Sequence, residues 1–504
     1  MYNKNRKISI LVFSLFVVIC FAIVCKFTPN TYIYQNRVDG YAIRLPKGMY
    51  ADESVSSVRT VFSTEHITLA VYYETCETEN DKLGYVAYSN RFLENTQDFD
   101  VVQNDVISLG DFSATLSRWD RKVLSRVEND KNHYACYDID AHTAGIYTLF
   151  FKYDDTVHFE TDITPIAESF VTCTATRQGE NKMLGLSETP KPNSETQMVY
   201  DALFSDEASL TWGLFSPYAV RNHTVVDKLE QELDYSFDVY LLYSNFGETP
   251  YLNGETVYDA LCLSCPEDQI PELTLQTVDD NKGNMLLRTL DGEFDAFLHA
   301  YANEVAMYGR PVLFRLANEM NGDWCTYCAF HYCRDPDLYV AFYRYVFDIF
   351  KQEGTDNVIW VWNPNHRSFP NFKWNNEILY YPGDAYVNVV GLTAYNTGNY
   401  YEGEYWASFD ELYSELYSRT LAQYAQPIMI TEFASSSVGG DKAAWISDMF
   451  ERIGEYPEIK VAVWWNSCDM DNSGEEPVPA RPYYLDETEK TTAAFKQGIH
   501  SAGD

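Results

Sequence analysis

The chain has little positive charge. Its 504 residues include 37 Lys and Arg against 74 Asp and Glu, so the formal net charge at pH 7 is −37. Binding to nucleic acid phosphates needs a basic surface, so this composition disfavours a nucleic acid partner. Anionic polysaccharides and anionic wall polymers are disfavoured for the same reason. A neutral glycan is a compatible ligand, although the acidic charge can also serve solubility alone.

The composition also lacks the marks of a disordered protein. Hydrophobic residues make up 46% and charged residues 22% of the chain, which is typical of globular proteins. The length suits two or three domains. Aromatic residues are plentiful, with 40 Tyr, 29 Phe and 10 Trp. Aromatic faces stack on sugar rings, but they also fill protein cores, so their number alone does not indicate a function.

One long apolar run opens the chain. Ile8–Cys25 follows Lys4, Arg6 and Lys7, and as a helix it would be about 27 Å long, close to the thickness of a bilayer core. No small residue directly precedes Cys25, which disfavours both cleavage and lipid attachment there. We predict a signal anchor over residues 1–27, a single-pass transmembrane helix in the cell membrane with the remainder outside the cell. A cleaved signal peptide and a secreted protein are the alternative.

The next part of the chain shows no catalytic constellation. Residues 30–177 contain alternating or apolar runs such as Ile67–Tyr73 and Tyr147–Tyr153, separated by turn signals. We predict a smaller α+β accessory domain, built on an antiparallel sheet with a few helices. GYAIRLPKGMY (Gly40–Tyr50) resembles the opening of PsbP-like domains. Residues 178–198 are polar and hold two prolines, as linkers do.

From residue 199 to residue 504, strand patterns alternate with helix patterns, which predicts an α/β domain, a (β/α)8 TIM barrel. Between the strands, apolar residues recur at helical spacing, for example from Phe294 to Val305 before Gly309. Asp335-Pro336 and Ser408–Glu411 read as helix starts. The eight predicted strands are Thr211–Phe215, Phe237–Leu242, Glu272–Gln276, Val312–Leu316, Val358–Trp362, Val387–Leu392, Ile428–Thr431 and Val461–Trp465.

Two glutamates directly follow or end two of these strands. Glu319 comes after Val312–Leu316, and Glu432 follows Ile428–Thr431. Because active sites of such barrels lie at the carboxyl ends of the strands, both carboxyl groups are expected at one face. Glycosidic bond cleavage needs one protonated and one ionised carboxyl group, so the pair predicts a glycoside hydrolase. Two structural glutamates exposed after strands are the alternative.

The stretches around these glutamates resemble glycoside hydrolase family 26, the β-mannanase family, over about residues 205–500. The matching stretches are RLANEMNGDW (Arg315–Trp324), VVGLTAYN (Val389–Asn396), PIMITEFASS (Pro427–Ser436) and VAVWWN (Val461–Asn466). The resemblance implies that Glu319 is the acid/base and Glu432 the nucleophile of a retaining enzyme. Asn318 departs from the family, which usually has His before the acid/base, and this puts the substrate in doubt.

The resemblance also implies substrate-binding residues. Arg315 matches the motif arginine and would keep a carboxylate ionised, unless it forms a purely structural ion pair. Tyr395 matches a tyrosine that hydrogen-bonds the nucleophile. Trp464 aligns with the tryptophan beneath the sugar, although Trp465 is its neighbour at the same strand end. Trp324 is expected at a neighbouring subsite. For each aromatic residue, packing in the core is the alternative.

Other residues that suggest a site are less specific. His366, after the fifth strand, is either a subsite residue or a loop histidine. The barrel cysteines Cys262, Cys265, Cys325, Cys328, Cys333 and Cys468 have partly zinc-like spacing, but an exported chain favours disulfides over free thiols or zinc. Asp469–Gly474 resembles the start of a calcium loop, yet Ala480 stands where the closing ligand belongs. We therefore expect no metal and no cofactor.

The function predicted from sequence is a retaining endo-glycoside hydrolase that cleaves β-1,4-mannan or a related neutral β-glycan by double displacement. A β-glucanase with the same fold and mechanism is one alternative, because Asn318 permits it. A catalytically silent, glycan-binding barrel is another, although retention of both glutamates disfavours it. The sequence gives no oligomeric state.

Overall fold

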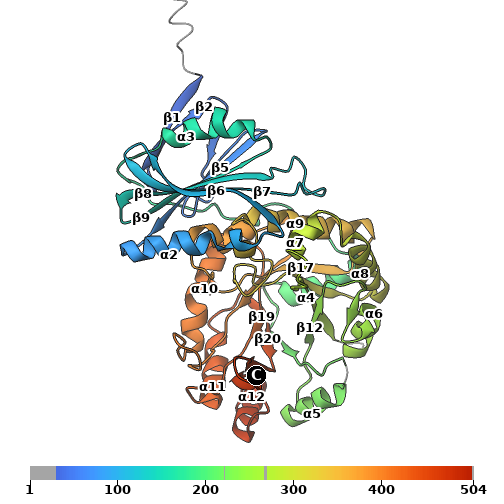
Figure 1. Cartoon of the computed structure of the whole chain (residues 1–504). Helices are drawn as coiled ribbons and strands as arrows, with labels where there is room; N and C mark the ends of the chain where they lie inside the picture. The colour runs from blue at the N-terminus through green and yellow to red at the C-terminus, as the bar shows by residue number, and fades with distance from the viewer. Residues whose placement is uncertain (1–29, 221, 266–268, 502–504) are drawn as a thin grey trace, which may run out of the picture.

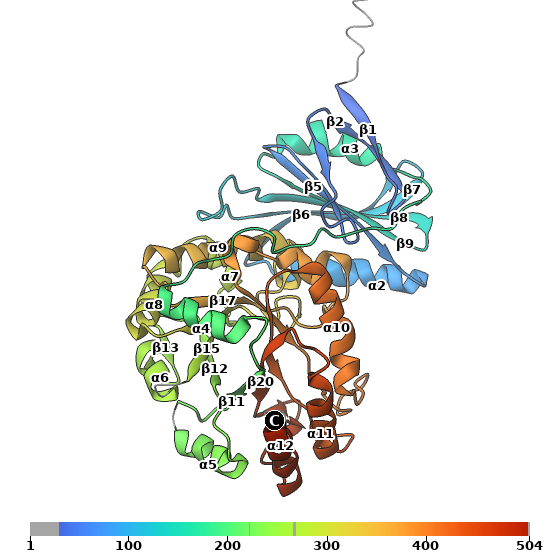
Figure 2. The ribbon, with the colours of Figure 1, turned by 180° about the vertical axis from the view of Figure 1, so that it is seen from behind.

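The computed structural model describes residues 30–220, 222–265 and 269–501. It has an N-terminal β-rich domain that sits on a closed barrel, and helix α2 (Glu79–Ser89) lies between the two (Figures 1 and 2). The predicted anchor Ile8–Cys25 lies outside the described residues. Within the described ranges, no helix is both long enough and apolar enough to cross a membrane.

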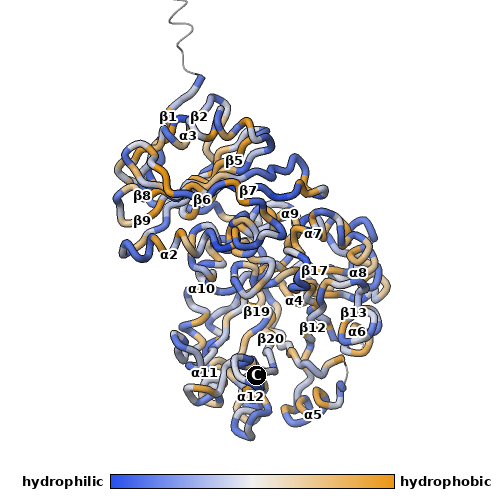
Figure 3. Tube along the Cα trace, viewed as in Figure 1, coloured by the Kyte–Doolittle hydropathy of each residue, from blue (hydrophilic) through white to orange (hydrophobic). Residues whose placement is uncertain are grey.

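The N-terminal domain is built on a seven-stranded antiparallel sheet, as the sequence predicts. Its strands, in spatial order, are β3 (Tyr50–Asp52), β4 (Thr60–Ser63), β5 (Ile67–Thr75), β9 (Gly145–Tyr153), β8 (His133–Thr143), β7 (Phe112–Arg121) and β6 (Phe99–Leu109). A smaller sheet holds β1 (Thr31–Asn36), β2 (Tyr41–Pro46) and β10 (Val171–Thr172). Short helical segments complete it: η1 (Arg91–Glu94), the π-helix η2 (Phe159–Ile163) and α3 (Thr164–Glu168). Hydrophobic residues gather along β5, β8 and β9 (Figure 3).

The second domain is a closed barrel of eight parallel strands, which confirms the predicted architecture. The strands are β11 (Thr211–Phe215), β12 (Val239–Asn245), β15 (Ile270–Gln276), β16 (Val312–Leu316), β17 (Val358–Trp362), β18 (Val389–Thr393), β19 (Ile428–Phe433) and β20 (Ile459–Trp465). β11 pairs with β20 and closes the circle. Strands such as β16 and β17 are buried along their whole length, as expected for parallel strands covered by helices.

Helices surround the barrel, with one departure from the regular alternation. They are α4 (Ser194–Phe204), α5 (His223–Leu233), α6 (Val257–Ser264), α7 (Met285–Leu290), α8 (Asp295–Tyr308), α9 (Pro336–Gln352), α10 (Phe409–Gln423), α11 (Lys442–Ile453) and α12 (Glu489–Ser501). Between β17 and β18 the chain forms only the 3₁₀ turns η4 (Lys373–Asn375), η5 (Glu377–Tyr380) and η6 (Asp384–Tyr386).

The predicted helix boundaries have clear local causes. Gly309 ends α8 in the left-handed conformation with φ 71°, which glycine adopts without strain. The Asp335 side chain accepts a hydrogen bond from the Asp337 amide and starts α9, with Pro336 in its first turn. Ser408 and Glu411 form the reciprocal capping box of α10. The Asp335 and Ser408 caps also fix where the loops after β16 and β18 finish.

The two domains share buried polar and aromatic contacts. Arg334 of the barrel donates to Asp138 of β8 over 3.3 Å, and both side chains are at most 1% exposed. Trp374 donates to Ser89 of α2 over 3.0 Å. One hydrophobic cluster contains residues of both domains, including Tyr85 and Trp374. The N-terminal domain therefore holds the loops that follow β16 and β17.

The predicted linker lies along the barrel. Residues 173–193 form isolated bridges, such as Leu184 beside Tyr424, and the Gly185 amide donates to Asp384 over 2.6 Å. Helix α4 begins at Ser194, within the predicted linker range. Whether the ranges 30–177 and 199–504 fold independently stays a prediction.

Candidate active site

A cavity of about 990 Å³ opens at the carboxyl ends of the barrel strands. Both Glu319 and Glu432 line it, together with residues from loops that follow most of the strands. The barrel geometry explains this meeting, since parallel strands deliver their carboxyl ends to one face. The cavity is the place where the two predicted catalytic residues come together.

Glu319 stands on a tight turn directly after β16. Ala317 and Glu319 have φ values of 46° and 56°, a left-handed conformation that residues other than glycine adopt rarely. The turn is fixed by the Glu319 amide, which donates to the Asn363 carbonyl over 2.7 Å. The Asn365 amide group donates to Glu319 Oε1 over 2.6 Å. Backbone strain of this kind is often found at functional sites, where surrounding contacts enforce it.

The environment of Glu319 favours its protonated form. Burial, and next the negative charge of Glu432, raise the pKa of Glu319 to about 8, while the hydrogen bond from Asn365 opposes the shift. At neutral pH the carboxyl group therefore holds a proton. Both Asn365 and Trp324 form side-chain hydrogen bonds with this carboxyl group.

Glu432 lies within β19 and accepts hydrogen bonds from the buried Arg315 and the half-buried Tyr243. Arg315 Nη2 lies 3.0 Å from Glu432 Oε2, and the Tyr243 hydroxyl donates to the same oxygen. Arg315 is itself oriented by Thr274, at 2.8 Å from its Nε, and by Asn363, at 3.0 Å from its Nη1. Hydrogen bonds to an ionised carboxylate stabilise the charge. The site thus sets Glu319, whose pKa is raised, opposite a glutamate that contacts a guanidinium.

A third glutamate, Glu272 of β15, was not predicted from sequence. Its Oε1 lies 3.4 Å from Arg315 Nε, and the side chain is fully buried. Burial raises the pKa of Glu272 to about 8, although the Arg315 charge opposes the shift. With Glu272 protonated, the charge of Arg315 is matched by Glu432 alone. A charged residue inside the apolar run IPELTLQ was the signal that could have revealed it.

Trp465, rather than the predicted Trp464, lines the cavity. The prediction for Trp464 is wrong because alternate residues of a strand point to opposite faces. Trp464 is fully buried against Phe433, at a ring-centroid distance of 5.3 Å, between β20 and the outer helices. The Trp465 ring stacks on Phe215 at 5.2 Å and faces the cavity.

Tyr395 also lines the cavity, where its ring lies 5.2 Å from Tyr483 and 6.2 Å from Trp465. The hydroxyl hydrogen-bonded to Glu432 is that of Tyr243, which sequence reasoning missed. Tyr243 sits near the end of β12, and that strand-end position was the available signal. The predicted hydrogen bond between Tyr395 and the nucleophile stays a prediction.

The remaining predicted residues lie at different depths in the cavity or beneath it. Asn318 lines the cavity and accepts a hydrogen bond from Gln276 over 2.7 Å. Trp324 lies at the cavity edge, 52% exposed, with its ring 5.3 Å from Phe369. His366 lines the cavity too, and burial lowers its pKa to about 4. Arg315 lies beneath the cavity and acts on it through Glu432.

The rim opposite Trp324 is formed partly by the hairpin of β21 (Cys468–Asp471) and β22 (Val478–Pro482). Arg481 lies 2.9 Å from Asp469 and also contacts Glu404. The stretch that resembles a calcium loop thus forms an acidic rim, with Asp469 paired to an arginine.

The prediction of disulfides is wrong for the described residues. All nine cysteines in the described ranges are free thiols, and Cys265, Cys325, Cys328 and Cys333 are buried. Burial raises the pKa of the Cys328 thiol to about 12, so it stays protonated. These cysteines pack as small apolar side chains in the barrel loops.

Comparisons with known proteins agree with this geometry. Residues 258–436 match the sequence model of "Glycosyl hydrolase family 26". "Endoglucanase H" of Acetivibrio thermocellus is 35% identical over 180 residues, which cover 35% of this chain and 20% of that protein. "Mannan endo-1,4-beta-mannosidase" of Bacillus subtilis strain 168 is 29% identical over 173 residues, 32% of this chain and 41% of that protein. The match therefore spans well under half the length of these curated relatives.

Among solved structures, the catalytic domain of an endo-β-1,4-mannanase from Bacillus sp. JAMB-750 matches with a TM-score of 0.48 and 17% identity, covering 63% of this chain and 94% of that one. The sequence matches confirm the predicted resemblance to family 26 over the matched part of the chain.

Proposed function

We propose that the barrel, whose residues 258–436 carry the family 26 match, is a retaining endo-acting glycoside hydrolase. Its substrate would be β-1,4-mannan or a related neutral β-glycan. The observation that carries the proposal is the contrast between the two glutamates. Glu319 is buried with its pKa raised to about 8, and Glu432 accepts hydrogen bonds from Arg315 and Tyr243.

The first chemical step uses both carboxyl groups. Glu432, ionised beside Arg315, attacks the anomeric carbon of the sugar, while Glu319 gives its proton to the departing glycosidic oxygen. The bond between that carbon and the oxygen breaks, and an ester between the sugar and Glu432 forms. Arg315 and Tyr243 hold the attacking carboxylate in place before the reaction.

The second step reverses these roles. Glu319, now ionised, removes a proton from water, and the resulting hydroxide displaces Glu432 from the anomeric carbon. Two displacements leave the configuration of that carbon unchanged. The negative charge on Glu432 returns at the end of the cycle, which again favours protonation of Glu319.

The sugar is proposed to lie on aromatic side chains. Trp465 and Tyr395 line the cavity beside Glu432, and Trp324, which hydrogen-bonds Glu319, forms a more exposed edge with Phe369. Aromatic faces pack against the apolar faces of sugar rings and leave the hydroxyl groups to polar residues such as Asn318. Asp469 and Glu404 both pair with Arg481, whose single positive charge offsets one of the two negative charges and leaves this rim acidic, which suits a neutral polymer better than an anionic one.

A second candidate keeps the mechanism and changes the polymer to a β-glucan. It is favoured by Asn318, which stands where the family usually has His, and by the 35% identity to a protein named an endoglucanase. Endo action rests on the names of the relatives, which include an endoglucanase and endo-mannosidases.

The cellular location of the protein is also a proposal. We infer that Ile8–Cys25 anchors the protein in the cell membrane and that the barrel works outside the cell, supported by the apolar run and the basic residues before it. Mass analysis of the native N-terminus tests this, and a mature chain that begins after residue 20 would contradict it.

The test of the activity is a product profile. The purified protein is incubated with mannan, mixed-linkage and β-1,4-glucans, and xylan, and the oligosaccharides are separated by chromatography. Release of a ladder of oligosaccharides from mannan or β-glucan, absent in a Glu319→Gln, Glu432→Gln double variant, is expected. A protein that binds these glycans but releases nothing would be the silent barrel and would overturn the proposal.

A further inference from the structure

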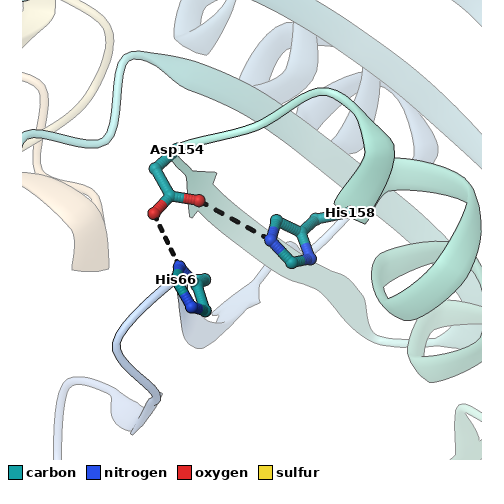
Figure 4. Close-up of side chains that lie close together, drawn as sticks. All are labelled: His66, Asp154 and His158. Atoms are coloured by element: carbon teal, nitrogen blue, oxygen red, sulfur yellow. Dashed lines mark hydrogen bonds and ion pairs between the residues drawn. The ribbon is translucent and has the colours of Figure 1, made fainter.

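The N-terminal domain holds a cluster of metal-binding side chains remote from the barrel cavity. His66, Asp154 and His158 each offer a ligand atom, and these atoms all lie within 4.8 Å of one another. Figure 4 shows the Asp154 carboxylate reaching both imidazole rings, with one oxygen toward each. None of the three lines the cavity that holds Glu319 and Glu432. The cluster therefore has no part in the proposed hydrolysis.

The fold brings these residues together through strand register. Ile67, the first residue of β5, pairs with Tyr153, the last residue of β9. Because the strands are antiparallel, His66 and Asp154 directly extend this pair on facing chains. His158 comes four residues after Asp154, at the start of the helical segment that continues into η2. The ends of two neighbouring strands and the start of one helical segment thus meet at the cluster.

The ligand atoms are spaced closely enough for one small ion. His66 Nδ1 lies 2.8 Å from Asp154 Oδ2, and His158 Nε2 lies 3.7 Å from Asp154 Oδ1. A tetrahedral zinc ion holds nitrogen and oxygen donors at about 2.0–2.2 Å, so the donors themselves stand roughly 3.3–3.6 Å apart. The ligand atoms lie within 4.8 Å of one another, and all three side chains are partly exposed, so an ion can reach them.

A neighbouring carboxylate orients one of the ligands. The Asp162 Oδ2 oxygen lies 2.8 Å from His158 Nδ1, the ring nitrogen that points away from Asp154. When Nδ1 carries the proton and donates to Asp162, the lone pair of Nε2 faces the Asp154 carboxylate. Metal-binding histidines commonly donate their other ring N–H to a carboxylate in this way. A cation between Nε2 and Asp154 would satisfy both electron-rich atoms.

The local charge is compatible with a cation. Asp154 and Asp162 flank the rings, and Glu65 lies near His66, while Lys131 is the cation that acts on His66. The two imidazole rings stack at a centroid distance of 5.3 Å, an arrangement in which two positively charged rings would repel. With both rings neutral, Asp154, Asp162 and Glu65 together carry more negative charge than Lys131 balances.

We propose that His66, Asp154 and His158 bind one divalent transition-metal ion, of the type that zinc represents, with water at the remaining position. Imidazole and carboxylate ligands suit zinc and exclude the soft, thiolate-preferring ions. The ion would tie the turn before β5 to the end of β9 and the start of η2. Its role is structural, at the ends of two neighbouring interior strands of the seven-stranded sheet.

The test measures zinc binding by the whole protein. The chelator-treated protein is alkylated under native conditions, because free cysteines also bind zinc, and is then titrated with ZnCl₂ in competition with a chromophoric indicator. We expect one site that His66→Ala or His158→Ala weakens at least tenfold, and that Asp162→Asn weakens by about 10-fold or more. Zinc should raise the melting temperature of the unsubstituted protein but not of these variants.

The matched control is His223→Ala in α5. His223 Nδ1 lies 2.8 Å from Asp227, so it forms the same kind of His–Asp pair four residues apart, without a second histidine. This variant should bind zinc as the unsubstituted protein does. Visible bands of bound Co²⁺ should likewise require His66 and His158. Equal zinc affinity in the unsubstituted protein and a His66→Ala, His158→Ala double variant would overturn the proposal, as would no binding by either.

Discussion

Arg334 of the barrel and Asp138 of the N-terminal sheet form an ion pair of 3.3 Å that is almost completely excluded from water. Cys333 and Arg334 both have positive φ, so the loop after β16 is bent to deliver this guanidinium. The same loop begins with Glu319 and carries Trp324. The accessory domain is therefore coupled to a loop that forms one wall of the cavity.

Removing one partner of this pair should destabilise the protein strongly. Arg334→Met leaves Asp138 buried without its cation and should lower the free energy of unfolding by about 3–5 kcal/mol. Denaturant unfolding measures the change. The control is Lys122→Ala, which breaks an ion pair with Asp291 in which Lys122 is 76% exposed. A loss as small as that expected for the control, below about 1 kcal/mol, would contradict the role given to Arg334.

The rate should fall as the pH rises through the pKa of Glu319, which is about 8. Proton donation needs the protonated acid, and this form disappears above that pH. The pH profile of kcat/KM on an unactivated glycan should show this basic limb. An aryl glycoside with a good leaving group needs less proton donation in its first step. Release of the aryl group in a single turnover should therefore fall less with rising pH than the rate on the glycan does. A profile flat from pH 6 to above pH 9 on the glycan would contradict the assignment.

Asn365 should set the pH at which this fall in rate occurs, which is the basic limb of the pH profile. Its hydrogen bond lowers the pKa of Glu319, so Asn365→Ala should move the basic limb to higher pH while lowering the rate. Asn376→Ala removes an amide that caps η5, away from the cavity, and should leave the limb unchanged. A shift of the limb to lower pH in Asn365→Ala would show that this contact does not stabilise the carboxylate.

The two neighbouring tryptophans of β20 should behave differently. Trp465→Ala removes a ring that lines the cavity and should reduce kcat/KM on polysaccharide with a modest effect on stability. Trp464→Ala empties a fully buried site and should cost about 3–5 kcal/mol of unfolding free energy. Steady-state kinetics and denaturant unfolding of both variants check the pair. Reversed effects would mean that the strand faces are assigned the wrong way round.

Glu272→Gln should change how stability depends on pH. A Glu pKa raised from about 4.3 in the unfolded chain to about 8 in the folded chain favours the fold fully below the lower value. That contribution is lost as the pH rises through about 8, because the buried carboxyl group must then ionise. Relative to the unsubstituted protein, the glutamine variant should therefore gain stability between pH 5 and pH 9. An unchanged difference across this range would show that Glu272 is already ionised at pH 5.

Much of the fold could be predicted because local signals agreed with it. β16 and β17 begin and end where the apolar runs do, and Gly309 ends α8 as expected. Glu319 and Glu432 could be located because strand ends in a barrel share one face. The 3₁₀ connection between β17 and β18 gave no periodic pattern that could be recognised.

Contacts between distant segments could not be predicted. The contacts of Tyr243 with Glu432, and of Glu272 with Arg315, form only when the barrel closes. The sequence does not show which residues of strands so far apart lie side by side. Whether Trp464 points to the cavity or to the outer helices depends on the register of the strand. A shift of one residue moves a side chain to the opposite face. The pairing of Arg334 with Asp138 depends on how two domains dock, and Arg334 has no local pattern that marks it.

The most direct test of the account is to trap the covalent intermediate. Glu319→Ala is mixed with an aryl β-mannoside or β-glucoside, whose leaving group departs without a proton donor. The sugar should accumulate on Glu432, because the water that releases it lacks a base. Peptide mass spectrometry should find the label on Glu432, and added azide should release a β-glycosyl azide with retained configuration by NMR. A label on another residue, or a product of inverted configuration, would contradict the assignment of Glu432 as nucleophile and Glu319 as acid/base.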